Sequence, residues 1–193
     1  MLAIRALPLF ALIFLVGCAH PIVTTPNMSD LSAKDFRKSD KVVGYYISTE
    51  DRERRVTTPG GGGDKISYQP YKDLEPGLQK ILSNAFTDVI TLSSRDDKAA
   101  VQKHNIAFIF TPHITTNSSS DSAFTWPPTK FTVSLACEAI DRNGKTVFQT
   151  KTEQEGNASF SEFKHDFPLA AKRAMAQALL ELQKQLAAAP ALR

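Results

Sequence analysis

The feature that most constrains this fold is a predicted β-hairpin from Phe131 to about Glu153. The chain alternates apolar and polar residues on both sides of Asn143-Gly144, a pair that two-residue turns favour because both turn positions need a positive φ. Folding the chain about this turn places one set of apolar side chains on a single face, namely Phe131, Val133, Leu135, Cys137, Ala139 and Phe148. The alternation therefore predicts an antiparallel pair that is covered on one face only.

Two more segments are predicted to be strands. Val42 to Ser48 is rich in β-branched and aromatic residues. Ile106 to Phe110 is apolar on both faces, which is typical of a central strand, and Pro112 should end its pairing on one side. Val89 to Leu92 either extends the preceding helix or forms a short strand, because periodicity alone does not decide between them.

Two helices are predicted from apolar residues at helical spacing. The first begins near Asp73, which we expect to cap it, and carries Leu74, Leu78, Ile81, Leu82, Ala85, Phe86 and Val89. The last follows Asp166, the expected cap, and carries Ala171, Met175, Ala178, Leu179, Leu182 and Leu186. A brief helical turn is expected from Asp97 to His104.

This order of elements predicts an α+β domain over residues 41–189. Its sheet should be mostly antiparallel, with the two main helices packed on one face. The chain has two cysteines, and if Cys18 is the lipid acceptor described below, Cys137 is the only thiol left. No internal disulfide can then form, and a hydrophobic core must supply the stability. The formal net charge of +3 is too small to indicate a nucleic-acid partner.

Residues 1–17 are predicted to be an export signal peptide. One positive charge, Arg5, precedes an apolar run from Ala6 to Val16, which is shorter than the roughly 20 residues of a spanning helix. Residues 18–40 contain prolines and no sustained period, so we expect a flexible tether that lets the domain stand roughly 25 Å from the membrane.

Leu15-Val16-Gly17-Cys18 resembles the bacterial lipobox. The resemblance implies cleavage before Cys18, a diacylglycerol on its thiol, and an N-acyl chain such as palmitate on the new amine. Because Ala19 follows rather than aspartate, it also implies the periplasmic face of the outer membrane. The alternative is an ordinary secretory signal, in which case Cys18 is removed or stays a free thiol.

Two long loops are candidate sites. Thr49 to Lys72 shows no predicted helix or strand, and loops of this length are usually functional or disordered. Its run Gly60 to Gly63 is not a phosphate-binding loop, because Lys65 is followed by Ile66, so it is interpreted as a flexible tip or an anion contact. Its candidate partner contacts are Arg54, Arg55, Tyr68 and Tyr71.

The second loop, Phe124 to Pro128, contains the only tryptophan, Trp126. Phe124 and Trp126 either anchor a partner or fold back onto the core, and the sequence favours neither. No catalytic constellation is predicted: Cys137 faces inward, where a thiol is inert, and the histidines lack metal-ligand spacing. We expect no metal and no cofactor beyond the lipid.

The lipobox and the order of elements from Val42 to Leu186 resemble small envelope lipoproteins of the YajG and LptE type. They also resemble the related fold of penicillin-binding-protein activators and the TolB N-terminal domain. The resemblance implies a non-catalytic role in envelope assembly. The hypothesis is an outer-membrane lipoprotein, not an enzyme, that binds another envelope protein through its two long loops. The alternative is a carrier of lipid, lipopolysaccharide or glycan in a groove between helices and sheet.

Overall fold

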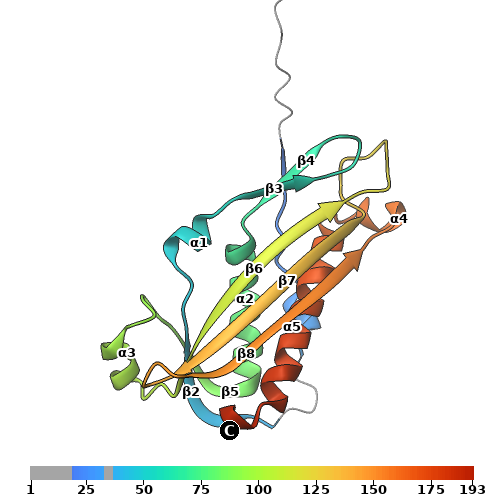
Figure 1. Cartoon of the computed structure of the whole chain (residues 1–193). Coiled ribbons are helices and arrows are strands. Elements are labelled where there is room, and N and C mark those ends of the chain that lie inside the picture. Colours follow the sequence, from blue (N-terminus) through green and yellow to red (C-terminus); the bar gives the residue numbers. More distant parts are fainter. Residues whose placement is uncertain (1–18, 33–36) are drawn as a thin grey trace, which may run out of the picture.

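The computed structural model describes residues 19–32 and 37–193. The predicted signal peptide and its lipid-acceptor Cys18 lie outside the described residues. The described chain forms two sheets and two long helices, which confirms the predicted α+β class (Figure 1).

The main sheet has five strands in the order β5-β2-β6-β7-β8. They are β2 (Ser39–Tyr45), β5 (Phe86–Thr91), β6 (Phe108–Ser119), β7 (Lys130–Asp141) and β8 (Thr146–Asn157). The three long strands are antiparallel, whereas β2 runs parallel to both of its neighbours. β6 is central, as predicted, and β2 pairs with it only as far as Phe110, just before Pro112. The segment whose type was left open, Val89 to Leu92, lies largely in β5.

The hairpin of β7 and β8 is confirmed, including its buried face. Its turn differs from the prediction, because Gly144 has a positive φ of 79° but Asn143 does not. Asp141 organises the turn instead: its carboxylate accepts the backbone N–H of Asn143 at 2.8 Å and that of Lys145 at 3.0 Å. A side-chain acceptor of this kind stabilises a longer turn with only one left-handed residue.

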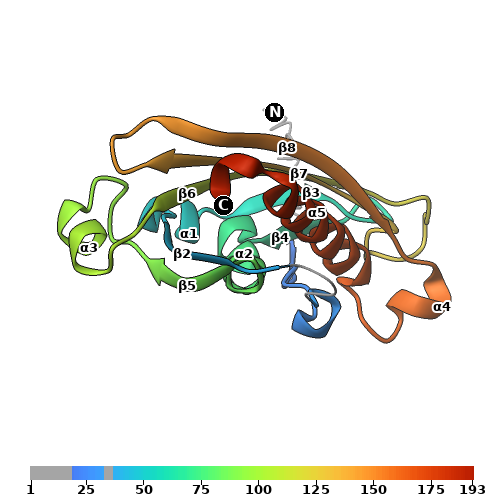
Figure 2. The ribbon, with the colours of Figure 1, turned by 90° about the horizontal axis from the view of Figure 1, so that it is seen from below.

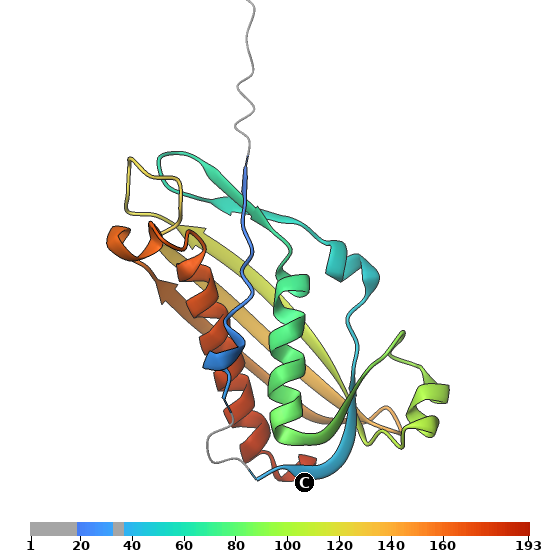
Figure 3. The same cartoon turned by 180° about the vertical axis from the view of Figure 1, so that it is seen from behind.

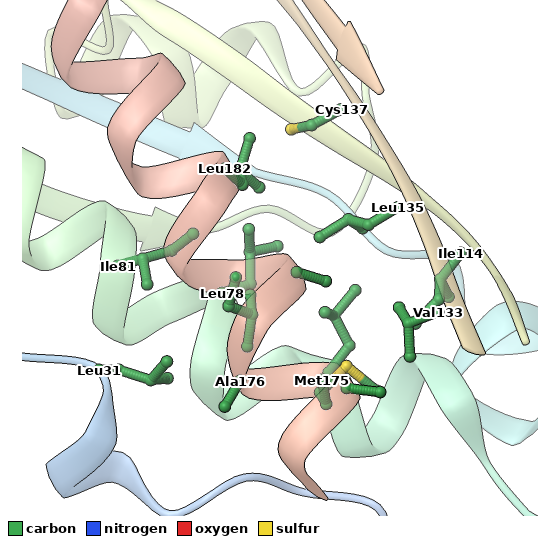
Figure 4. Packing of buried hydrophobic residues seen from close by; sticks show 14 of the residues in the cluster. Leu31, Leu78, Ile81, Ile114, Val133, Leu135, Cys137, Met175, Ala176 and Leu182 are labelled. Carbon is green, nitrogen blue, oxygen red and sulfur yellow. The ribbon is translucent and has the colours of Figure 1, made fainter. Parts of the chain in front are cut away.

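Helices α2 (Pro70–Ala85) and α5 (Leu169–Ala188) cover one face of the main sheet, as predicted (Figure 2). Between them and the sheet lies the core, where Leu78, Met175 and Leu182 are at most 1% exposed (Figure 4). The predicted caps are wrong. α2 begins earlier, at Pro70, and the carboxylate of Asp73 points to another segment. Asp166 forms an ion pair with Lys172 instead of capping α5.

The loop from Thr49 to Lys72 is structured, contrary to the prediction. It contains α1 (Thr49–Glu53), β3 (Val56–Pro59) and β4 (Lys65–Tyr68) before α2 begins. β3 and β4 form an antiparallel hairpin whose turn is the glycine run, with positive φ at Gly62 and Gly63. The short strands alternate too few residues to be recognised from the sequence. The predicted helical turn before β6 is confirmed as α3 (Lys98–Lys103), capped by Asp97.

Residues 19–32, predicted to belong to the flexible tether, pack against the domain. We call them the strap. Their strand β1 (His20–Pro21) pairs in parallel with β4, and a short 3-10 helix, η1 (Met28–Asp30), follows. Ile22, Thr24 and Leu31 of the strap are at most 9% exposed. Figure 3 shows the strap running along the outer side of α2 and α5. The prediction failed because this segment lacks periodicity of its own and is ordered only by tertiary contacts.

The remaining elements close the two ends of the domain. A short helix α4 (Phe160–Phe163) lies between β8 and α5, and a 3-10 turn η2 (Pro190–Leu192) follows α5. The strap enters at the end that carries α4 and the β3–β4 turn, which we call the apex. α3 and the β7–β8 turn lie at the opposite end, which we call the base (Figures 1 and 3).

Candidate functional site

The two loops selected from the sequence meet at the apex. The N–H of Gly61 donates to the carbonyl of Trp126 at 2.8 Å, and the N–H of Gly62 donates to the carbonyl of Ser122 at 3.1 Å. A side chain at Gly61 would overlap the carbonyl oxygen of Thr125, so only glycine permits this approach. The glycine run is therefore a packing device that holds the second loop in place.

The two aromatic side chains of the second loop differ in exposure, and whether either anchors a partner stays a prediction. Phe124 is 96% exposed, whereas Trp126 is half-buried. The Trp126 ring stacks on His20 of the strap, with centroids 4.4 Å apart and planes 17° apart, and its other neighbour is Phe167 at 5.0 Å. Trp126 therefore joins the strap, the loop and the start of α5, and Phe124 alone projects from the loop.

Two further phenylalanines are exposed in the segment between β8 and α5. Phe160 is 63% exposed and Phe167 is 47% exposed. We define the apical surface as Phe124, Trp126, Phe160 and Phe167. Sequence reasoning missed the last two, although a Phe-rich stretch between a strand and a helix was the signal that could have found them.

The other predicted partner contacts lie elsewhere. Tyr68 and Tyr71 are at most 5% exposed, so in this conformation they offer a partner almost no surface. The hydroxyl of Tyr68 shares a 2.7 Å hydrogen bond with the Thr116 hydroxyl, and burial raises its pKa. Arg54 lies 5.6 Å from the Tyr71 ring and pairs with an acid of its own helix turn, while Arg55 is exposed on the chain leading into β3. Only Phe124 and Trp126 of the predicted set share the apical surface.

A pocket of about 600 Å3 lies at the base, where α3, β6 and the β7–β8 turn meet. Its floor is apolar and consists of Val101, Ile109 and Ile140. Its rim is polar: Gln102 and Asn105 are neutral, and charges of both signs come from Arg95, Asp96, Lys98, Asp141 and Arg142. The sequence did not indicate this pocket, because its walls come from three separate segments.

Specific polar contacts hold the rim in shape. Arg142 donates to the side-chain oxygen of Asn105 at 2.6 Å and to the carbonyl of Ile106 at 2.7 Å, and Asn105 itself has a φ of 54°. Arg95 pairs with Glu138 at 2.7 Å. Hydrogen bonds from Thr146 and Arg95 lower the pKa of Glu138, so its carboxylate stays charged near neutral pH. These contacts fix two of the rim side chains, Arg95 and Arg142.

Two features of the described residues bear on metal and thiol chemistry. Residues 19–32 and 37–193 contain no cluster of three or more His, Cys, Asp or Glu that could hold a metal ion. Cys137 is 1% exposed, and burial raises the pKa of its thiol to about 12. Across the same residues, no helix has both the length and the apolar character needed to cross a membrane.

Known proteins resemble this chain in structure only. No protein-family model and no curated protein matches the sequence. A Caulobacter crescentus protein described as a candidate lipoprotein is 14% identical, with 83% of this chain and 92% of that chain covered and a TM-score of 0.40. A Xanthomonas campestris protein of family DUF330 is 11% identical, with coverages of 82% and 86% and a TM-score of 0.48.

A third neighbour is PelC from Paraburkholderia phytofirmans, solved as a dodecamer. It is 12% identical, with 76% of this chain and 93% of that chain covered and a TM-score of 0.44. At these identities and scores the likenesses carry no inference about function or assembly. The narrower resemblance to YajG- and LptE-type proteins stays a prediction.

Proposed function

We propose that this chain is a lipid-anchored, non-catalytic binding protein on the periplasmic face of the outer membrane, an assembly factor that captures another envelope protein. The observation that carries the proposal is the basal pocket. It lies at the base, whereas the strap begins at the apex, so a chain anchored through Cys18 presents it away from the lipid attachment (Figures 1 and 3). A membrane protein that must reach a periplasmic partner needs its binding site at that end.

The chemistry of the pocket supports protein binding. An apolar floor inside a polar rim is the pattern of a protein interface, where an apolar side chain fills a pocket and polar groups around it set the orientation. The residues that line it include two carboxylates, Asp96 and Asp141, but no Ser, Cys or His, so no hydroxyl or thiol nucleophile lies among them for a base to activate. The rim carries both signs of charge, which suits a mixed polypeptide surface better than a uniformly charged ligand.

The second candidate is a ligand carrier, and its place differs from the one expected. The space between helices and sheet is occupied by core side chains such as Leu78 and Leu182, which are at most 1% exposed. A glycan or a lipid headgroup would instead use the basal pocket, whose volume is in the range of small-ligand sites. Arg95, Lys98 and Arg142 at the rim favour an acidic group in that case.

Site-specific crosslinking tests the proposal. A photoreactive amino acid is placed at Gln102, which lines the pocket, or at Lys103, the next residue of α3, which does not. In whole envelopes we expect a discrete protein adduct from position 102 and none from position 103. Gln102→Trp should fill the mouth of the pocket and abolish capture of the same protein, whereas Lys103→Trp should leave capture intact.

The Cys18→Ser chain serves as the second control, because it lacks the lipid acceptor. An adduct that forms equally well without the anchor would remove the membrane from the proposal. A lipid or glycan adduct at position 102, with no protein, would favour the carrier. Equal labelling from positions 102 and 103 would contradict the pocket as the binding site.

A further inference from the structure

We propose that the apical surface lies in the lipid interface of the membrane that holds the anchor, so that the strap fixes the domain with its apex on the bilayer. The inference rests on lipid attachment at Cys18, which belongs to the proposed function. A domain held in this way lies directly on the membrane, and not roughly 25 Å from it as expected for a flexible tether. The occupant of this surface is the bilayer, whereas the protein partner is assigned to the base.

The strap leaves almost no free chain between the lipid and the domain. Only Ala19 separates Cys18 from His20, so the two Cα atoms of Cys18 and His20 are at most about 7 Å apart. His20 pairs with Ile66 of β4, and the N–H of Ile22 donates to a β4 carbonyl at 2.9 Å. Acyl chains on Cys18 therefore hold the apex, and not merely a tether, at the membrane.

The strap also brings the anchor directly to the apical surface. The His20 ring stacks on Trp126 at 4.4 Å, and Trp126 contacts Phe167 at 5.0 Å. These three rings form a continuous row that begins two residues after the predicted lipid attachment. Because the acyl chains must lie in the bilayer, the aromatic row beside them lies at its surface.

Exposed apolar side chains gather at this end of the molecule. Among the described residues, four large apolar side chains are exposed, at 47% to 96%: Val23, Phe124, Phe160 and Phe167. Val23 belongs to the strap, and the three phenylalanines belong to the second loop and to the segment around α4 (Figure 1). Exposure of a phenylalanine such as Phe124 to water is unfavourable. Transfer of the same side chain to the boundary between headgroups and acyl chains lowers the free energy.

The charges at the apex indicate whether electrostatic attraction or apolar insertion would bind it to the membrane. Lys65 and Lys164 are exposed there, but so are Asp64 and Asp121 in the two apical loops. Such a balance gives no net attraction to anionic headgroups, and salt would screen what remains. We therefore expect insertion to depend on the phenylalanines and to be the same in neutral and anionic membranes.

Single-cysteine labelling of the purified lipoprotein tests this arrangement. Cys18 carries lipid, and Cys137 is buried with its pKa raised to about 12, so an introduced cysteine is the only thiol that reacts with a label near neutral pH. An environment-sensitive fluorophore is attached through Phe124→Cys or Phe160→Cys at the apex, and through Lys145→Cys in the basal turn. Each protein is reconstituted into vesicles of neutral phosphatidylcholine, alone or mixed with an anionic phospholipid. Each vesicle type is prepared with and without nitroxide-labelled lipid, and no second protein is present.

We expect the fluorophores at positions 124 and 160 to shift to shorter wavelength and to be quenched by shallow nitroxides. The fluorophore at position 145 should behave as it does in water, which makes it the matched control. Equal quenching at the two ends, or none at the apex, would overturn the inference. Quenching at the apex only with anionic lipid would also overturn it, because charge would then replace apolar insertion. These vesicles contain no second protein, so the outcome is independent of the crosslinking at Gln102.

Discussion

Replacement of Asp73 tests the strap most directly. Asp73 lies on α2 and is 7% exposed, yet the hydrogen-bond donors to its carboxylate belong to the strap. One oxygen accepts the backbone N–H of Thr24 at 2.9 Å and the Thr24 hydroxyl at 3.0 Å, and the other accepts the Thr25 hydroxyl at 3.4 Å. Thr24 is fully buried, so both of its donors depend on this carboxylate.

The expected loss follows from these contacts. Asp73→Ala leaves two buried donors of Thr24 without an acceptor, each at a cost of about 1–3 kcal/mol. We expect the free energy of unfolding to fall by about 2–6 kcal/mol, with the strap opening before the domain. In Asp73→Asn one amide oxygen still accepts both Thr24 donors, so about 1 kcal/mol should be lost.

Two measurements separate strap opening from general destabilisation. Denaturant unfolding gives the total change, and amide hydrogen exchange at Ile22 and Thr24 reports the strap alone. In Asp73→Ala these two amides should exchange much faster than in the unchanged protein. The exchange rates of β7 amides should change only by the amount that the loss of global stability predicts. Unchanged exchange at Ile22 and Thr24, or an equal loss in Asp73→Asn and Asp73→Ala, would refute the role assigned to the carboxylate.

Two further predictions concern the apex. Gly61→Ala should lower the free energy of unfolding by about 1–3 kcal/mol, because its side chain overpacks against the Trp126 loop, and should change the fluorescence of Trp126. The matched control is Gly63→Ala, whose side chain meets no neighbour. It should cost about 1 kcal/mol of backbone strain and leave the fluorescence of Trp126 unchanged. The pKa of exposed Glu162 is lowered to about 2 by its hydrogen bonds from Arg173 and from Ser159. A lowered pKa means that the contact is complete above pH 4.5 and is lost as pH falls toward 2. The amide shift of Ser159 should follow that titration, and Glu162→Gln should abolish it.

The elements that could be predicted from the sequence are those in which a periodic apolar pattern repeats over many residues. β7 alternates over twelve residues and α5 repeats its apolar stripe over twenty, so each pattern defines a face without outside help. β3 and β4 have four residues each and were missed. Their hairpin depends on contacts between the glycine turn and a loop some sixty positions later, which no local pattern can carry.

The candidate sites, like the elements of the fold, could be predicted only where the signal is local in the sequence. Phe124 and Trp126 stood out because a proline-stiffened loop with aromatic residues is a local signal. The basal pocket was not predictable, because residues as distant as Val101 and Ile140 form one floor only after the sheet has assembled. Tyr68 and Tyr71 were misplaced for the opposite reason: both follow the glycine run in the sequence, but they lie in β4 and α2, which turn them inward.

The order of the strap could not be predicted from the sequence, and it bears on the orientation of the domain. A segment with little helical or strand preference was judged flexible, yet Leu31 and Thr24 are fully buried, so its order comes from surfaces that the domain provides. Under the lipidation proposed for Cys18, that order would set the direction in which the domain points from the membrane. In the proposed arrangement, with the apex at the bilayer, the base would face the periplasm at a fixed distance, and a partner with an apolar side chain would meet a pocket of fixed orientation. Freeing the strap should therefore weaken capture at Gln102 even though the pocket itself is untouched.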